Sequence, residues 1–196
     1  MESQALKHGR LSEEKYQELG HVMDRYGELS LFIDDEANSV SQICRRARKL
    51  HRIHPLGLIV VDYLQIVSPP SDTKNAPRVR QIGAMTKLLK QLSLELSVPI
   101  ILLSQLSRAC EQRNPSRPAP YLADLRDSGE IEEDADSVVM LYRHGRYDPD
   151  CEHPTHTEVL IEKNRDGATG SILLDFDQQR VRFTAITASS VFEPTI

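Results

Sequence analysis

The chain has 196 residues, with 39% hydrophobic and 27% charged side chains and a formal net charge of −5 at pH 7. This composition predicts one soluble globular domain with a substantial core. It excludes a membrane-spanning protein, because no apolar run approaches the roughly 20 residues needed to cross a bilayer. The N-terminus lacks the apolar segment of a secretory signal, and three widely spaced cysteines suit a reducing cytosol, so we expect a cytoplasmic protein.

Two elements are expected near the N-terminus. Ser12 is a favourable N-cap, and the two glutamates after it place carboxylates in the first turn, so a helix is expected over 12–26. Residues 29–33 are apolar and predict a short buried strand.

A second helix follows, capped by Ser39 or Ser41. Its apolar positions recur at helical spacing: Val40, Ile43, Cys44, Ala47 and Leu50. The opposite face carries four cations: Arg45, Arg46, Arg48 and Lys49. We interpret this face as solvated; contact with nucleic acid is the alternative.

Residues 58–61 form a continuous apolar run that ends at Asp62. Such a run is typical of a strand buried on both faces, as in a parallel sheet. A loop at 68–77, a long helix at 79–96 and a second buried strand at 98–103 are expected next. The Asp62 carboxylate is expected just past the C-terminal end of the first of these strands, which is where open α/β sheets bind ligands.

The last part of the chain predicts strands instead of alternating helices. They are expected at 138–142, 157–162, 171–176 and 181–183. Alternating strands and helices followed by hairpins predict an α/β fold whose parallel sheet is extended by antiparallel strands. We expect one domain over 1–183 and a C-terminal tail over 184–196.

Four motifs follow one another in the order seen in one family. They are IVVDYLQ at 59–65, PIILLSQLSR at 99–108, DLRDSGEIEEDAD at 124–136 and EKNRDG at 162–167. On these motifs the chain resembles, from Leu6 to Phe183, the C-terminal motor domain of a DnaB-type replicative DNA helicase. The resemblance implies a RecA-like α/β fold, a mostly parallel sheet flanked by helices, here truncated at its N-terminal side.

One family feature is missing from the sequence. The family opens its motor domain with a glycine-rich phosphate loop, GxxxxGK[ST], whose backbone N–H groups and lysine cradle phosphates. No such segment occurs in the 196 residues. The strand that ends in the family's water-activating glutamate is missing too. We therefore expect the downstream part of a motor domain without its ATP cradle.

The resemblance assigns nucleotide roles to two strand ends. Asp62 would be the Walker B carboxylate that holds Mg²⁺ on the triphosphate; a strand-end cap is the alternative. Gln105 would sense the γ-phosphate if its strand neighbours that of Asp62; a polar strand terminus is the alternative. Gln65 belongs to the same motif as Asp62, but we interpret it as structural.

Two further residues are implied in ATP hydrolysis. Lys163 and Arg165 alternate along a strand and should point the same way. In the family such a pair reaches a neighbouring subunit's γ-phosphate, where cations offset the charge that develops in phosphoryl transfer. A solvated strand end before the Gly167 turn is the alternative. ATP and Mg²⁺ are therefore expected cofactors, but only with a complete or neighbouring subunit.

The resemblance also implies contact with single-stranded DNA. The segment at 124–129 resembles the loop that holds the strand in the family, which assigns phosphate contacts to Arg126, Asp127 and Gly129. Arg108 and Arg113 would face the same central channel. The negative net charge argues against an overall electrostatic attraction to nucleic acid but allows a local one.

A metal site is the weakest hypothesis. Cys151, His153 and His156 crowd one loop, but the spacing lacks the second ligand pair of a zinc site.

By resemblance the function is that of an ATP-dependent replicative helicase. Six such subunits form a ring that translocates on single-stranded DNA, and primase and a helicase loader are further candidate partners. The rival hypothesis is a non-enzymatic, truncated paralogue that binds DNA or pairs with intact helicase subunits. A third option, a RecA-like recombinase or circadian ATPase relative, is disfavoured by the motifs DYLQ, SQLSR and DLRDSG.

Overall fold

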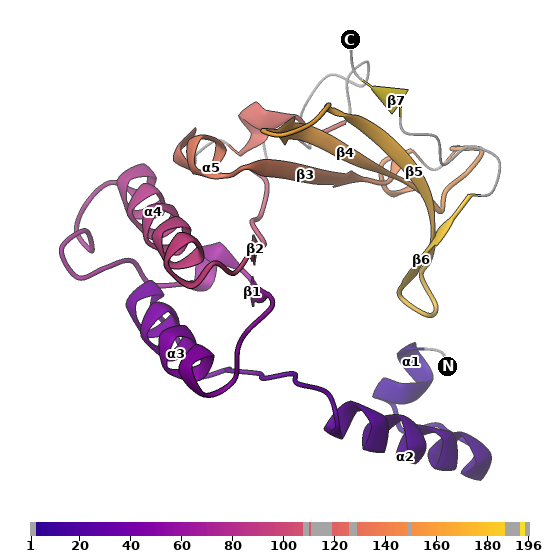
Figure 1. The fold of residues 1–196 in the computed structure, drawn as a ribbon. Helices are drawn as coiled ribbons and strands as arrows, with labels where there is room; N and C mark the ends of the chain where they lie inside the picture. The colour runs from indigo at the N-terminus through magenta and orange to yellow at the C-terminus, as the bar shows by residue number, and fades with distance from the viewer. Residues whose placement is uncertain are drawn as a thin grey trace. The chain divides into compact units, whose positions relative to one another are not determined.

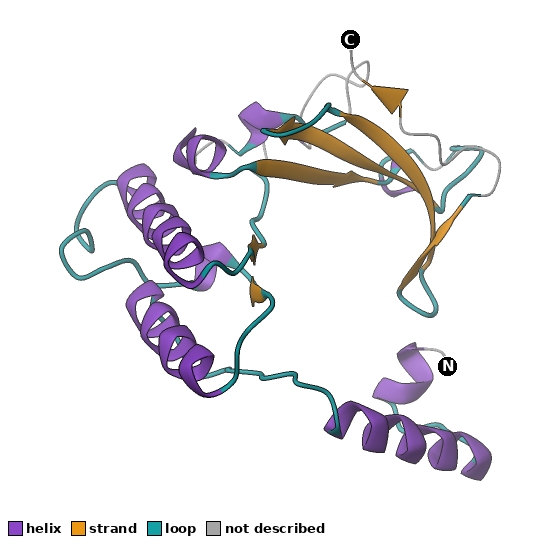
Figure 2. Ribbon diagram, in the orientation of Figure 1, coloured by secondary structure: helices purple, strands orange, loops and turns teal. Residues whose placement is uncertain are grey.

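The computed structural model describes residues 3–107, 110, 119–125, 129–148, 150–186 and 193–194. Its contacts divide the chain into two compact units. The first contains Met1–Asp34, Leu141–Leu160 and Gly170–Ile196, and the second contains Asp35–Met140 and Ile161–Thr169. Figure 1 labels the helices and strands of both units, and Figure 2 distinguishes them by type.

The second unit contains two long helices. α3 (Val40–Ile53) begins at Ser39, whose hydroxyl accepts a hydrogen bond from the Gln42 N–H at 3.4 Å, so the first of the two expected caps is the one used. α4 (Arg78–Leu96) is the longest helix among the described residues. The long helix expected over 79–96 is confirmed as α4.

The core of the second unit lies between these helices and the strand that ends at Asp62. The helices contribute the apolar stripes that the sequence predicts, and Leu64, Met85, Leu92 and Val40 are fully buried. The whole cluster consists of Val40, Cys44, Ala47, Val61, Leu64, Val67, Ile82, Met85, Leu89, Leu92 and Ile131. Burial of apolar surface on this scale is the main force that fixes α4 against its neighbours.

Two short parallel strands lead into the segments with the expected nucleotide residues Asp62 and Gln105. β1 (Ile59–Val61) pairs with β2 (Ile100–Leu102), with Val61 opposite Leu102. The side chains of Ile59 and Val61 face the core, whereas Val60 is 55% exposed and Ile101 is 51% exposed. The prediction of burial on both faces is therefore wrong for one face. Apolar runs do not reveal which face lacks a covering layer.

The strand expected at 29–33 is not formed. These residues have no regular secondary structure, and Ile33 is 85% exposed. The apolar composition suited a strand, but a strand requires a neighbour to accept its ladder of hydrogen bonds, and no strand pairs with this segment among the described residues.

The first unit combines helices near the N-terminus with antiparallel strands. α1 (Ser3–Lys7) and α2 (Glu13–Gly27) come first, and the Ser12 cap of α2 is confirmed by a bond from the Lys15 N–H. Later strands are β5 (Gly170–Asp177), β6 (Arg182–Ala185) and β7 (Glu193–Pro194), and both β6 and β7 run antiparallel to β5.

A five-stranded sheet has the order β3-β4-β5-β6, with β7 also beside β5. β3 (Ser137–Tyr142) alternates exposed and buried residues along its length, as the period of two predicts, and β4 is His156–Asn164. The remaining elements are short: α5 (Gly129–Asp134) and the 3₁₀ turns η1 (Leu64–Ile66), η3 (Leu122–Asp124) and η4 (His144–Arg146). Among the helices that the structure describes, none has the length and apolarity needed to cross a bilayer.

Candidate functional site

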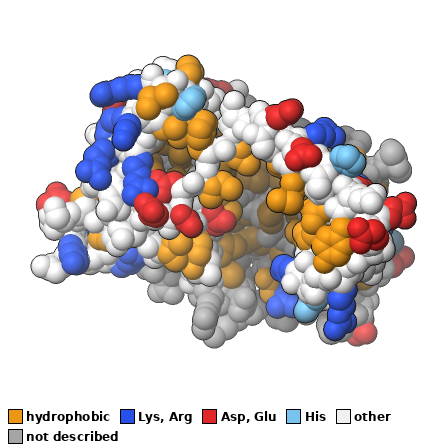
Figure 3. All heavy atoms as spheres, turned by 90° about the horizontal axis from the view of Figure 1, so that it is seen from below, with side chains coloured by type: hydrophobic (Ala, Val, Ile, Leu, Met, Phe, Trp, Pro, Cys, Tyr) orange, Lys and Arg blue, Asp and Glu red, His pale blue; other side chains and the backbone are white. Residues whose placement is uncertain are grey.

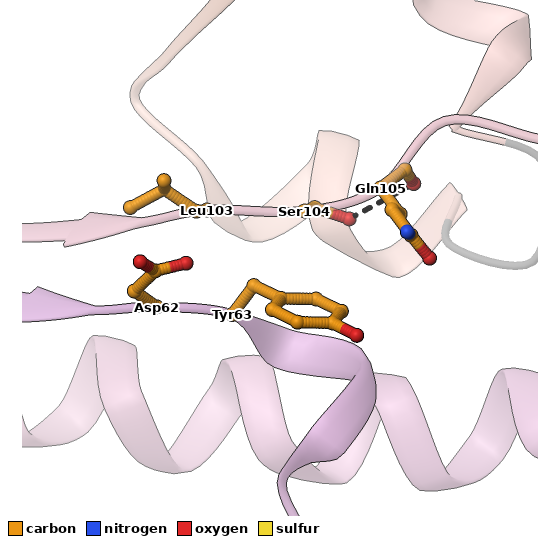
Figure 4. Close-up of a pocket in the computed structure, with 5 residues that line it drawn as sticks. All are labelled: Asp62, Tyr63, Leu103, Ser104 and Gln105. Carbon is orange, nitrogen blue, oxygen red and sulfur yellow. Dashed lines mark hydrogen bonds between the residues drawn. The ribbon is translucent and has the colours of Figure 1, made fainter. Parts of the chain in front are cut away.

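The ends of β1 and β2 form a small pocket, which we call the strand-end pocket. It is lined by Asp62, Tyr63, Leu103, Ser104 and Gln105. The two strands run parallel, so their C-terminal ends meet at one edge, which is where open α/β sheets bind ligands. Figure 4 shows the Asp62 carboxylate turned toward the neighbouring strand and the Gln105 side chain on the side of its segment that faces Tyr63. The structure thus brings the two expected nucleotide residues together.

The strand-end pocket is too small to hold a nucleotide by itself. Its volume is about 200 Å³, below the roughly 300 Å³ at which ligand pockets begin. Asp62 is exposed and offers one carboxylate, which suits Mg²⁺, because this ion is usually held by one or two carboxylates together with substrate phosphates. The pocket therefore fits one side of a metal–phosphate site, and other groups would have to supply the remainder.

Hydrogen bonds fix the second wall of the pocket. The backbone ladder between the strands ends where the Leu64 N–H donates to the Leu103 carbonyl at 2.9 Å. Past this last backbone bond, the Gln65 side chain makes the next hydrogen bonds to the segment after β2. Its Nε2 donates to Ser104 Oγ at 2.9 Å, and its Oε1 accepts from the Gln105 N–H at 3.1 Å. Gln65 thus holds in place Gln105, the residue expected from the sequence to sense the γ-phosphate.

Lys163 lies near the C-terminal end of β4 and Arg165 directly follows this strand; both side chains are bonded within their own unit. The Lys163 ammonium donates to the carbonyl of Glu132 in α5. The guanidinium of Arg165 donates to Asp136 Oδ1 at 2.8 Å, and the Arg165 N–H donates to the Asp136 carbonyl at 2.8 Å. The expectation that the two cations point the same way agrees with this geometry, since both reach the segment at 132–136.

Asp136 gathers a third cation from α4. The Lys90 ammonium lies 2.5 Å from Asp136 Oδ2, so this carboxylate joins Lys90, Arg165 and the nearby Lys163 into one group, which we call the Asp136 cluster. The hydrogen bond from Lys90, together with the charges of all three cations, holds the pKa of the Asp136 carboxyl below its ordinary value. Asp136 and Lys90 were missed by the sequence reasoning. A lone aspartate before a strand carries no local signal of three distant partners.

A match to a known protein family agrees with this geometry. A family model described as the DnaB-like helicase C terminal domain matches residues 1–185. The chain belongs to this family. The span agrees with the resemblance carried by the four motifs, and it confirms that interpretation.

Two curated relatives illustrate the similarity. The replicative DNA helicase DnaB of Rickettsia typhi is 40% identical over 201 residues, covering 93% of this chain and 40% of that protein. The DnaB of Geobacillus stearothermophilus is 38% identical over 182 residues, covering 92% of this chain and 39% of that protein. The chain thus spans about 40% of the length of these relatives.

Solved structures in the DnaB-like family have the same fold. One, described as an ATPase domain, matches with a TM-score of 0.87 and 34% identity over 95% of this chain and 66% of that one. Another is a DnaB-like replicative helicase studied for its interactions with primase, with a TM-score of 0.86 and 34% identity over 95% of this chain and 46% of that one. The expected α/β RecA-like fold is therefore confirmed.

The segment for which the sequence predicts contact with DNA is described only in part. Arg108, Arg113, Arg126 and Asp127 lie outside the described residues. Gly129 is exposed and begins α5. Just before the segment, Asp124 is buried at 5% exposure and accepts a hydrogen bond from the Tyr121 N–H at 2.9 Å, which stabilises the turn leading into it. Contact with DNA here stays a prediction.

The loop with Cys151, His153 and His156 forms no metal centre among the described residues, which contain no group of three or more His, Cys, Asp or Glu side chains arranged to hold an ion. The rings of His153 and His156 stack with centroids 4.4 Å apart. The two histidines therefore pack ring against ring.

The cationic face of α3 is partly neutralised. Arg46 pairs with Glu36 at 3.0 Å, and Arg48 pairs with Glu95 of α4 at 2.7 Å. Figure 3 shows Lys and Arg side chains gathered on the left of the view, the side on which α3 lies in Figure 1. Pairing of this kind fits a solvated helix surface and gives no support to nucleic-acid binding by α3.

Proposed function

We propose that this chain acts as part of the ATP-driven motor of a DnaB-type replicative helicase, unwinding duplex DNA as a hexameric ring that moves on single-stranded DNA. The observation that carries the proposal is that Asp62 and Gln105 line the same pocket at the ends of two parallel strands, in a chain of this family. On this proposal Asp62 holds the Mg²⁺ of the nucleotide and Gln105 responds to the γ-phosphate.

Lys163 and Arg165 are proposed to act on the nucleotide of a neighbouring subunit. Arginine suits this role because its planar fork can bridge two phosphate oxygens. The Arg165 side chain is 54% exposed even though it contacts Asp136, so a phosphate on another subunit could reach it. Arg108, Arg113, Arg126, Asp127 and Gly129 are proposed to contact the DNA backbone, and primase and a helicase loader are proposed partners.

The proposal is tested by complementation between subunits. The chain is mixed with an intact DnaB-type helicase in which the arginine equivalent to Arg165, here called the finger arginine, has been replaced. ATP turnover is then measured against the mixing ratio. The wild-type chain should restore turnover and Arg165→Ala should not. Arg180→Ala is a matched control, because Arg180 is 50% exposed and pairs with Asp177 at 2.7 Å, while Arg165 pairs with Asp136 at 2.8 Å. Equal rescue by both variants would refute the finger role.

A second candidate function concerns the 196 residues by themselves, which contain no GxxxxGK[ST] segment. On this alternative the chain binds DNA or a helicase subunit without hydrolysing ATP. The chain alone should then show no micromolar affinity for Mg-ATP in a calorimetric titration, since the phosphate loop supplies most triphosphate contacts. Co-assembly with the intact helicase, verified by sedimentation, without any restored turnover would favour this alternative.

A further inference from the structure

Gln65 has an unusual position in the second unit, because its side chain replaces the backbone ladder at the tip of β2. It follows β1 in η1, and its Nε2 donates to Ser104 Oγ at 2.9 Å and, more weakly, to the Gln105 carbonyl at 3.4 Å. Its Oε1 accepts from the Gln105 N–H at 3.1 Å. Both ends of one amide are therefore used on two consecutive residues of the pocket wall.

The backbone of Gln65 is bonded on its other side to the start of α4. The Arg78 guanidinium donates from Nη2 to the Gln65 carbonyl at 3.3 Å and from Nη1 to Gln81 Oε1 at 3.2 Å. Gln81 in turn donates from Nε2 to the carbonyls of Lys74 and Ala76, each at 3.0 Å. These bonds form a continuous path from the Gln105 backbone to the loop at 70–76.

Each step of this path depends on side-chain geometry. A glutamine amide offers one acceptor oxygen and two donor hydrogens, and an arginine fork offers donors in fixed directions, so displacement of one group misaligns the next bond. A strand-end residue held only by backbone bonds would be insensitive to the loop. Gln105, in contrast, is held by a side chain whose own main chain is tied to that loop.

We propose that Gln65 is a positioning residue for Gln105, and that Arg78 and Gln81 connect it to the loop at 70–76, so that movement of the loop changes the placement of Gln105. The inference rests on the proposed role of Gln105 in sensing the γ-phosphate. It assigns Gln65 a function in the strand-end pocket, where the motif by itself suggested a structural residue.

Hydrogen exchange of backbone amides in the full chain, followed by NMR, tests the first step. Gln65→Ala should lower the protection of the Gln105 amide by about three- to tenfold, the range expected for loss of one hydrogen bond. Gln65→Glu keeps an oxygen acceptor but removes the donor, so it should retain the protection of Gln105. Gln91→Ala, an exposed glutamine on the same helix as Gln81, is the matched control. Exchange at Leu89 and Leu92 reports whether each variant is folded.

The second step is tested from the far end of the path. Gln81→Ala removes the bonds to the loop without touching the strand-end pocket, and it should shift the Gln105 amide resonance and lower its protection, whereas Gln91→Ala should not. A residue with only a local structural role would not transmit this change. Equal Gln105 protection in Gln65→Ala and Gln91→Ala would overturn the positioning role. An unchanged Gln105 amide in Gln81→Ala would overturn the connection to the loop.

The outcome is separable from that of the complementation assay. The exchange measurement contains no nucleotide and no second protein, so it can fail while Arg165 still restores ATP turnover. Conversely, loss of the finger role leaves the hydrogen bonds of Gln65 unaffected.

Discussion

The strand-end pocket and the Asp136 cluster lie in the same unit, but they are held by different forces. In the pocket, Gln105 is fixed by two neutral hydrogen bonds with Gln65: the Gln105 N–H donates to Gln65 Oε1 at 3.1 Å, and Gln65 Nε2 donates to the Gln105 carbonyl at 3.4 Å. In the cluster, Arg165 is fixed by a charged contact of 2.8 Å to a carboxylate that also binds Lys90. The neutral network should be insensitive to salt and pH, whereas the charged one should respond to both.

The difference suits the two proposed tasks. A group that detects a phosphate in its own subunit benefits from a fixed frame, because its response depends on small changes in position. A cation that must engage a phosphate on another subunit has to leave its resting partner, and a half-exposed ion pair is weak enough to allow this. α4 connects both regions, since it carries Arg78 at one end and Lys90 farther along.

The largest expected effect comes from removing the support that both regions share. Leu92 of α4 is fully buried in the core. Leu92→Ala should lower the free energy of unfolding by about 2–5 kcal/mol, because it removes buried methyl groups and leaves a cavity. Urea denaturation followed by circular dichroism measures the change.

A control on the same helix isolates this effect. Leu94 is 68% exposed, so Leu94→Ala should stay within about 0.5 kcal/mol of the wild-type value. Similar losses from Leu92→Ala and Leu94→Ala would show that α4 does not support the two regions through its buried face.

A smaller effect distinguishes the two kinds of contact. Asp136→Asn removes the ion pairs with Lys90 and Arg165 and should cost about 0.5–1 kcal/mol at low salt, a value typical of partly exposed pairs. Raising the salt concentration to about 1 M should remove most of this difference, since the Debye length falls to about 3 Å. Denaturation curves at both salt concentrations measure it.

Gln65→Ala provides the comparison for Asp136→Asn. Its cost comes from neutral hydrogen bonds and should be nearly the same at low and high salt. If salt weakened the effect of both substitutions equally, the distinction between the two regions would be wrong.

The smallest effect is the pH dependence of the Asp136 cluster. The hydrogen bond from Lys90 lowers the pKa of Asp136 in the folded state below the ordinary value of 3.8. Its contribution to stability is therefore fully present above that value and is lost as the pH falls through the lowered pKa. The gap between wild type and Asp136→Asn should be constant near neutral pH and should close in strong acid. A gap that widens on acidification would contradict the lowered pKa.

Much of the fold was predictable because its signals are local. The Ser12 and Ser39 caps, the stripe along α4 and the strand that precedes Asp62 each depend on residues a few positions apart, so they are visible in the sequence. The four motifs in order were sufficient to recognise the DnaB-like family, which the family model and the solved relatives then showed. The exposed face of β1 and the missing strand at 29–33 were not predictable, because both depend on whether another layer or strand lies alongside.

The sequence by itself determined the family and the candidate residues Asp62, Gln105, Lys163 and Arg165, whereas the tertiary structure decided what holds them. Gln65 meets Gln105 across 40 positions, Asp136 meets Arg165 across 29, and Lys90 meets Asp136 across 46. No local pattern encodes such pairs, because capping and periodicity act within one or two turns of the chain. Their partners become defined only when the packing of α4 and the pairing of β1 with β2 bring these distant segments within hydrogen-bonding distance.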